Sequence, residues 1–341
     1  MPHFRTGTVT SVVSERAGLQ RVEVLMPDGA TARAYVLSDL LGTVAVGDEV
    51  VCNTTAVDLG LGTGGSHVVH WNLSRRELHL PGPDHVMKLR YTSLQSDVGT
   101  SELLHPNLPA SLGGAVVVAT QVHSQVGVVA ATIAAIRPGT RVVYVMTDGA
   151  ALPMALSDLV VSLRDLGAID ATVSAGHAFG GDLEAVTVAS ALSLAVHVAG
   201  AEVVIAGMGP GVVGTGTELG TTAIEAAHIV DTVDALGGRA VMCLRASSRD
   251  ERSRHQGVSH HTQTALRLAR SRPLVAVVEG AGDIDPAHGA AVHVEPPDIE
   301  AILDAAGLRI TTMGRDVTRD RLFFDAAAAA GALAVRELDG A

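Results

Sequence analysis

From Gly113 onward, short β-type runs alternate with helical stretches, and this alternation constrains the fold more than any other feature of the chain. Six runs rich in valine, isoleucine and alanine have the composition of strands that are covered on both faces. The runs are AVVVATQV (115–122), RVVYVMT (141–147), ATVSA (171–175), EVVIAGM (202–208), RAVMCL (239–244) and PLVAVVE (273–279). The helical stretches are 126–136, 155–166, 183–199, 218–236, 260–271 and a closing alanine-rich helix at 319–333. The alternation predicts a doubly wound, mainly parallel α/β sandwich over residues 115–341.

Residues 1–84 have a different pattern, in which short strand-like segments are separated by turn sequences. The turn Pro27-Asp28-Gly29-Ala30 lies between two such segments and is typical of a β-hairpin. Strands at this spacing indicate a small antiparallel β-barrel or sandwich, and we expect the barrel. The glycines of 58–65 imitate a phosphate-binding loop, but no helix follows them, so a barrel turn is the better interpretation. Residues 85–114 are predicted to be a linker or extended segment.

Composition excludes several classes of protein. The net charge of −12 and the aromatic content of 2% make nucleic acid an unlikely partner. Two cysteines are too few for a disulfide framework or a thiolate zinc site. The first residues lack the apolar core of a signal peptide, and the uncharged run 185–201 is too short for a membrane span. We therefore expect a cytoplasmic protein with no membrane partner, whose alanine- and glycine-rich helices permit a homo-oligomer such as a dimer.

Polar residues at the ends of the predicted strands are the candidates for chemistry, because open parallel sheets bind ligands beyond the carboxyl ends of their strands. His123 follows the first strand, Asp148 the second, and His177 and Asp182 the third. His177 is the predicted acid–base group, with Asp148 or Asp182 as its partner. Asp182 also stands where it would cap the helix predicted at 183–199. A divalent metal bound by some of these four residues is a second interpretation, although no local ligand spacing supports it.

A glycine-rich loop lies between the strand 202–208 and the helix predicted from Glu218. Its candidate ligand-binding residues are Gly209, Gly211, Gly214, Thr215, Gly216 and Thr217. Glycines let backbone N–H groups approach an anion, and a helix N-terminus adds a favourable dipole. The loop lacks the lysine of a phosphate-binding P-loop and the spacing of the dinucleotide fingerprint, so no cofactor is identified. A tight structural crossover is the alternative.

Residues 245–272 carry a net charge of +5, with seven arginines against two acidic residues. Three histidines, His255, His260 and His261, add to this segment. Arg245 and Arg249 directly follow a predicted strand and are candidate anion ligands, because guanidinium groups match phosphate and carboxylate geometry. A subunit interface or a cluster of intradomain ion pairs is the alternative explanation.

Several segments together resemble an uncharacterised bacterial family catalogued as domain of unknown function 3866. They are KLRYTSLQ (88–95), MTDGAALPMALSDLV (146–160), AGHAFGGDLEA (175–185), GPGVVGTGTELG (209–220) and RDERSRHQGVSHHT (249–262). The likeness runs from the N-terminal barrel to about residue 310. It implies a soluble bacterial protein without an assigned activity, and it therefore supplies no catalytic residues.

Two functions are consistent with these patterns. In the first, the protein binds a small anionic, phosphorylated ligand at the edge of the sheet and acts on it as a hydrolase or transferase. The glycine loop, Arg245 and Arg249 would then hold the anion. In the second, it is a non-enzymatic regulator or scaffold, whose barrel contacts a partner and whose α/β domain dimerises or senses a metabolite.

Overall fold

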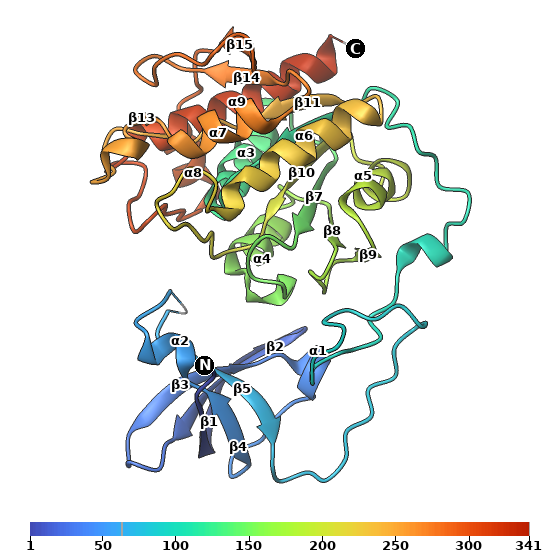
Figure 1. Cartoon of the computed structure of the whole chain (residues 1–341), viewed down its shortest axis with the longest axis vertical. Coiled ribbons are helices and arrows are strands. Elements are labelled where there is room, and N and C mark those ends of the chain that lie inside the picture. The colour runs from blue at the N-terminus through green and yellow to red at the C-terminus, as the bar shows by residue number, and fades with distance from the viewer. Residues whose placement is uncertain (63, 341) are drawn as a thin grey trace. The chain divides into compact units, whose positions relative to one another are not determined.

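The computed structural model describes residues 1–62 and 64–340 (Figure 1). The chain divides into two compact units, Met1–Gly99 and Thr100–Ala341. This division falls inside the segment 85–114. Within the described residues, no helix has the length and apolar character needed to span a membrane.

The first unit is a closed five-stranded barrel, which confirms the predicted barrel. Its strands are β1 (Phe4–Arg16), β2 (Leu19–Leu25), β3 (Thr31–Val36), β4 (Glu49–Asn53) and β5 (His67–Asn72), in the order β1-β2-β3-β5-β4. The pairing is antiparallel except between β3 and β5, which run parallel. The short helices α1 (Ser38–Leu41) and α2 (Thr55–Asp58) connect strands. The turn predicted at 58–65 includes Thr63, which lies outside the described residues.

Alternating side chains fill the interior of the barrel, as a two-residue strand period requires. Val22 and Val24 on β2 are almost completely buried, as are Val50 on β4 and Val69 on β5. These residues belong to a hydrophobic core separate from that of the second unit.

The second unit is built on an eight-stranded sheet in which all neighbouring strands of the described chain pair parallel, and it confirms the predicted α/β sandwich. The strands are β6 (Val116–Ala119), β7 (Val142–Thr147), β8 (Ala171–Ala175), β9 (Leu183–Ala185), β10 (Val203–Met208), β11 (Arg239–Met242), β14 (Leu274–Val277) and β15 (Ala290–His293). Their order is β15-β14-β11-β6-β10-β7-β8-β9. The central strands β6, β7 and β10 are buried throughout, which explains their unbroken apolar sequence.

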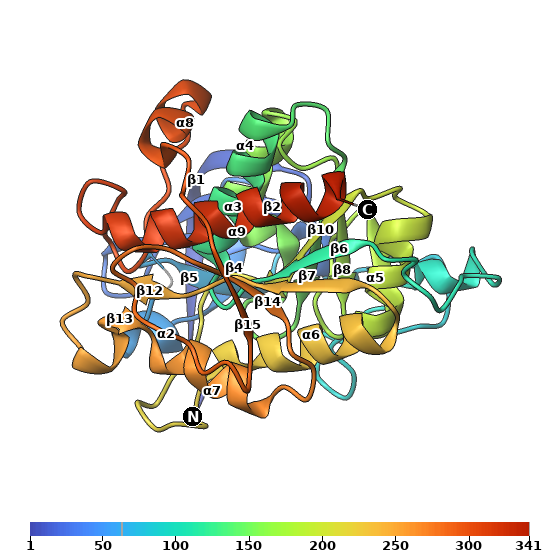
Figure 2. The same cartoon turned by 90° about the horizontal axis from the view of Figure 1, so that it is seen from above.

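Helices cover both faces of this sheet (Figure 2). One layer holds α3 (His123–Ile136), α4 (Asp158–Asp165), α8 (Ile299–Ala306) and α9 (Arg321–Asp339), and the other holds α5 (Val188–His197), α6 (Glu225–Ala235) and α7 (His260–Leu268). The chain leaves β6 through α3 on one face and leaves the neighbouring β10 through α6 on the other. The loops after β6 and β10 therefore diverge, and this is the position where open α/β sheets bind ligands.

Two predicted helices begin later than their sequences indicated. The stretch 183–199 starts with the edge strand β9, and α5 begins only at Val188, capped by Thr187. The prediction that Asp182 caps this helix is therefore wrong. The helix predicted from Glu218 begins at Glu225, after the 3-10 turn η3 (Thr222–Ile224).

The long helix α9 packs closely on α3 at Gly331, and Gly127 of α3 stands at a second crowded position, against Leu159 and Ile310. A Cβ atom on Gly331 would lie 3.0 Å from both Thr132 Cβ and Val129 O. A Cβ atom on Gly127 of α3 would lie 2.7 Å from Ile310 Cδ1. Glycine costs helix propensity at both positions, so close packing is the reason for its presence.

We expect Gly331→Val to lower the free energy of unfolding by about 1–3 kcal/mol through overpacking. Helix propensity alone predicts the opposite sign, a gain of a few tenths of a kcal/mol. Urea unfolding measures the difference, and Arg336→Val on the exposed side of α9 controls for placing valine in this helix. A stabilised Gly331→Val variant would contradict the packing account.

Candidate functional site

A small hairpin after β11 brings together residues that are far apart along the segment 245–261. Strands β12 (Ala246–Ser247) and β13 (Gly257–Val258) pair antiparallel, and the backbone N–H of Ser259 donates to the carbonyl of Arg245 over 2.8 Å. Ser259 then caps α7 by accepting from the N–H of His261. The hairpin therefore places Arg245 beside the start of α7.

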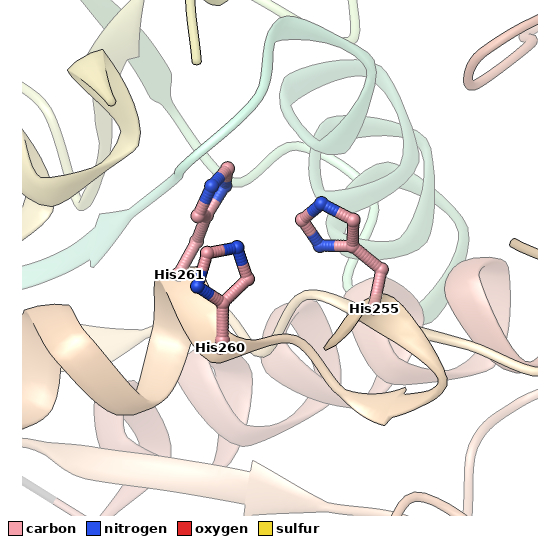
Figure 3. A group of neighbouring side chains, drawn as sticks. All are labelled: His255, His260 and His261. Carbon is pink, nitrogen blue, oxygen red and sulfur yellow. The ribbon is translucent and has the colours of Figure 1, made fainter. Parts of the chain in front are cut away.

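Three imidazole rings converge at this point: His255 from the 3-10 turn η4 (Ser253–His255), and His260 and His261 from the first turn of α7. Figure 3 shows the rings gathered around a common space. Their centroids lie 4.3–4.9 Å apart, and one ligand atom from each ring lies within 4.8 Å of the other two. His255 and His261 are buried, and His260 is half-buried. We call these three residues the histidine cluster.

Two nitrogen atoms of the histidine cluster have no hydrogen-bond partner among the described residues. His255 Nδ1 lies 2.7 Å from Ser259 Oγ, whereas His255 Nε2 is buried and unpaired. His260 Nε2 is buried and unpaired as well. Buried polar atoms are normally satisfied, so these two unpaired nitrogens are an exception and make the histidine cluster a candidate site.

The guanidinium of Arg245 lies against the histidine cluster. Arg245 is only 5% exposed, and its Nη1 lies 3.0 Å from His261 Nδ1. Because arginine only donates, His261 Nδ1 is the acceptor in this contact. Within the described part of the chain, no carboxylate oxygen lies within 4.0 Å of the Arg245 guanidinium. Burial, with the nearby Arg252, lowers the pKa of Arg245 to about 10, so the group is still charged at neutral pH.

Burial and the neighbouring Arg245 keep the histidine cluster uncharged near pH 7. Desolvation, reinforced by Arg245, lowers the pKa of His255 to about 4 and the pKa of His261 to about 3. Desolvation and nearby arginines also lower the pKa of His260. Neutral imidazole has a lone pair available on one nitrogen, which suits proton transfer or metal coordination.

A buried network of polar side chains holds Arg245 in position from the end of β6. The Thr262 hydroxyl accepts from the backbone N–H of Arg245 over 3.1 Å and donates to Gln121 Oε1 over 2.9 Å. Gln125 Nε2 donates to the carbonyl of Leu244 over 3.0 Å. Gln121, Gln125 and Thr262 are completely buried. The loop after β6 and the loop after β11 are thereby tied together at the carboxyl edge of the sheet.

A second network fixes the hairpin by ion pairs. Asp250 pairs with Arg252 over 2.8 Å and with Arg315 over 3.4 Å, and Arg315 pairs with the buried Asp320 over 3.0 Å. Asp320 also accepts from the hydroxyl of Ser247 on β12 over 2.6 Å. Arg252 and Arg315 thus have carboxylate partners, in contrast to Arg245.

Only part of the glycine-rich loop between β10 and α6 lies near the histidine cluster and the hairpin. A Cβ atom on Gly214 would lie 3.6 Å from His261 Cε1, and one on Gly216 would lie 3.4 Å from Arg254 Nη2. Gly209 lies elsewhere, against the carbonyl of Ala151.

The loop folds back on itself instead of opening toward a helix. Gly214 bridges to Thr221, and the N–H of Thr215 donates to Gly220 O over 2.8 Å. The N–H of Thr217 lies 3.4 Å from Thr215 Oγ1, so it too is used within the loop. Because α6 begins seven residues beyond Glu218, the loop does not lead directly into this helix. Gly214 borders the histidine cluster and Gly216 borders Arg254, but the expected loop-to-helix cradle is absent from the described residues.

The four predicted catalytic residues do not form one group. Asp182 accepts from the N–H of Thr172, near the start of β8, over 2.8 Å and pairs with Arg164. That contact places Asp182 away from the carboxyl ends of the strands. His123 is the first residue of α3, and its Nε2 atom lies 2.6 Å from the hydroxyl oxygen of the buried Ser157. Burial lowers the pKa of His123 to about 4.

Asp148 and His177 are in contact through a hydrogen bond from the backbone of His177 to the side chain of Asp148. Asp148 Oδ2 accepts from the N–H of His177 over 3.0 Å. Beside them, Glu225 Oε2 accepts from Thr147 Oγ1 over 2.7 Å, and burial, with the nearby Asp148, raises the pKa of Glu225. Asp148 and His177 follow β7 and β8, and Glu225 begins α6 after β10, whereas the histidine cluster follows β11.

Arg249 lies in the exposed turn of the hairpin, where its N–H donates to Ser247 Oγ over 3.1 Å. The sequence placed Arg245 and the three histidines in one basic segment, but the convergence of the three rings was not predicted. The spacing His255-x4-His260-His261, with a serine cap before the helix, was the available indication.

The ion pairs of Asp250 lead to a prediction on stability. Arg252 holds the pKa of Asp250 well below the ordinary value of 3.8, so the carboxylate stabilises the fold above about pH 4 and loses this effect at lower pH. We expect Asp250→Asn to lower the free energy of unfolding at pH 7 by about 1–3 kcal/mol, since the partner arginines are partly exposed. Urea unfolding at pH 7 and pH 3 measures the change.

The deficit of the Asp250→Asn variant should shrink between pH 7 and pH 3. Asp304→Asn, an exposed position on α8, serves as the control and should leave stability unchanged. A deficit that is the same at both pH values would contradict the assignment of these ion pairs.

Comparison with known proteins agrees with the resemblance seen in the sequence. Residues 33–331 match the model of a family described as protein of unknown function (DUF3866), and no curated protein matches the chain. The matched range begins in β3, ends in α9, and includes the hairpin, Arg245 and the histidine cluster. The chain therefore belongs to the DUF3866 family.

Proposed function

We propose that the protein binds a small anionic, phosphorylated ligand at the carboxyl edge of its parallel sheet, beside Arg245. The observation that carries this proposal is a buried guanidinium without a carboxylate partner. An unpaired charge in such an environment costs several kcal/mol, and an oxyanion would offset that cost. Guanidinium forms two parallel hydrogen bonds with phosphate oxygens, which favours this class of ligand.

The surroundings of Arg245 support an anion more than a cationic ligand. The positive charges of Arg252, Arg315 and Arg254 lower the pKa of Arg245, and the negative charge of Asp250 raises it. Asp250 itself is engaged by Arg252 and Arg315. The region therefore keeps an excess of positive charge that a dianion would reduce.

The position of the histidine cluster suits hydrolysis or transfer of the phosphoryl group. A neutral imidazole accepts a proton from an attacking hydroxyl or water, and its protonated form donates to a leaving oxygen. His177 and Asp148 are less suited to this step, because β11 and β7 are separated by β6 and β10. Three strand spacings of about 4.8 Å separate the ends of β11 and β7 by roughly 14 Å, a distance that a single phosphate group does not span. An acid–base role for His177 and Asp148 stays a prediction for an extended ligand.

We expect Arg245→Met to weaken the binding of inorganic phosphate by about 10- to 100-fold, the loss of one or two charge-assisted hydrogen bonds. Calorimetric titration with phosphate, and with a sugar phosphate and a nucleoside monophosphate in parallel, measures the dissociation constants. Arg249→Met tests whether the exposed turn of the hairpin adds to binding.

The matched control is Arg270→Met, which removes the same charge at an exposed position beyond the end of α7. It should bind phosphate as the natural protein does. Equal affinity in the Arg245→Met and Arg270→Met variants would contradict the proposed function, and so would the absence of binding to all three ligands.

A further inference from the structure

We propose that His255, His260 and His261 form a binding site for a divalent transition-metal ion of the zinc type. The three ligand atoms already lie within 4.8 Å of one another. Nitrogen atoms bound to one zinc ion at 2.0–2.1 Å lie about 3.3 Å apart in tetrahedral geometry. The widest pair would therefore close by roughly 1.5 Å, which a change of side-chain torsion angles supplies.

The unpaired nitrogens are an independent reason for a ligand at this position. His255 is 1% exposed, and its Nε2 has no hydrogen-bond partner among the described residues; the same holds for His260 Nε2. The Ser259 hydroxyl can accept a hydrogen bond from His255 Nδ1–H, and in this tautomer the lone pair of the ring is on Nε2. Metal-binding histidines are usually oriented by such a hydrogen bond on the other ring nitrogen.

The type of donor selects the type of metal. Three imidazoles without a free carboxylate suit zinc, cobalt, nickel or copper, whereas magnesium and calcium prefer oxygen. Asp250 and Asp320 of the hairpin network are engaged by arginines, and Glu218, whose charge acts on His260, pairs with Arg267. Three protein ligands leave a fourth coordination position open, as in catalytic zinc sites. A histidine bound to the ion has no free lone pair, so in the metal-bound protein a water molecule at the open position would take over the proton transfer assigned above to the imidazoles.

Metal binding and the Arg245–His261 contact exclude each other. If His261 binds the ion through Nδ1, it loses the lone pair that accepts from Arg245. If it binds through Nε2, the proton moves to Nδ1, which then cannot accept either. The ion therefore releases the Arg245 guanidinium from His261.

The released guanidinium remains close to the open coordination position. An anion held there would contact the ion and Arg245 together and would neutralise charge on both. This last step rests on the proposed function, whereas the metal site itself rests only on the histidine cluster.

The test is titration of the full chain, freed of any affinity tag and treated with a chelator, in phosphate-free buffer. Calorimetry with Zn²⁺ should give one site per chain with a dissociation constant of about 1 μM or lower. Co²⁺ should give the visible d–d absorption of a four- or five-coordinate ion. Mg²⁺ should not bind at this site.

Variants assign the site to the histidine cluster. His260→Gln, the half-buried member, should weaken Zn²⁺ binding by about 100-fold or more, since even loss of an outer hydrogen bond to a metal ligand costs about 10- to 100-fold. His255→Gln should act in the same direction. His228→Gln, at an exposed position on α6, is the control and should leave binding unchanged.

Circular dichroism and thermal unfolding show whether each variant is folded, and Zn²⁺ should raise the melting temperature of the natural protein but not of folded His260→Gln. The proposal is overturned if Zn²⁺ does not bind stoichiometrically, or if binding persists in the His255→Gln and His260→Gln variants. Phosphate titration of the chelator-treated protein separates this result from the proposed function, because anion binding to Arg245 does not require the ion.

Discussion

The buried positive charge of Arg245 is the constraint on which the arrangement of the hairpin and the histidine cluster depends. The guanidinium is charged at neutral pH, it has no carboxylate within reach among the described residues, and its contact with a side chain is made to a neutral imidazole. A fold keeps such a group only if the surrounding structure fixes it firmly. Here the Gln121–Thr262 network fixes the backbone of Arg245, and the hairpin ion pairs fix the segment that follows. The charge is therefore fixed in place without a carboxylate partner among the described residues, and the proposed anion site rests on this arrangement.

The topology explains why this arrangement occurs after β11. Strand β6 lies between β10 and β11, and the connections from β6 and β10 cover opposite faces of the sheet. The short β12–β13 hairpin follows β11, the other neighbour of β6, and is tied to the loop after β6 through Thr262 and Gln121. It carries His255 and delivers His260 and His261 at the start of α7. The proposed anion site and the proposed metal site are therefore adjacent: Arg245 would bind the anion, and the histidine cluster would bind the ion.

The sequence predicted the central layers of the fold, because strands buried on both faces have an unbroken apolar composition. It missed β9 and β15, since edge strands of three or four half-exposed residues lack that composition. Asp182 was misjudged because Thr172 and Arg164 bind its carboxylate more effectively than a helix terminus would. The rule on strand ends did select Arg245. It did not select the histidine cluster, whose convergence depends on a hairpin with two residues in each strand, too short to be recognised in a sequence.

The most direct test of the account is a crystal structure of the full chain grown with Zn²⁺ and phosphate, with anomalous diffraction recorded at the zinc edge. The account predicts an anomalous peak between the rings of His255, His260 and His261, and an oxyanion within hydrogen-bond distance of Arg245, which has moved away from His261. An unchanged Arg245–His261 contact, with zinc and phosphate absent from this position or bound only elsewhere, would contradict it.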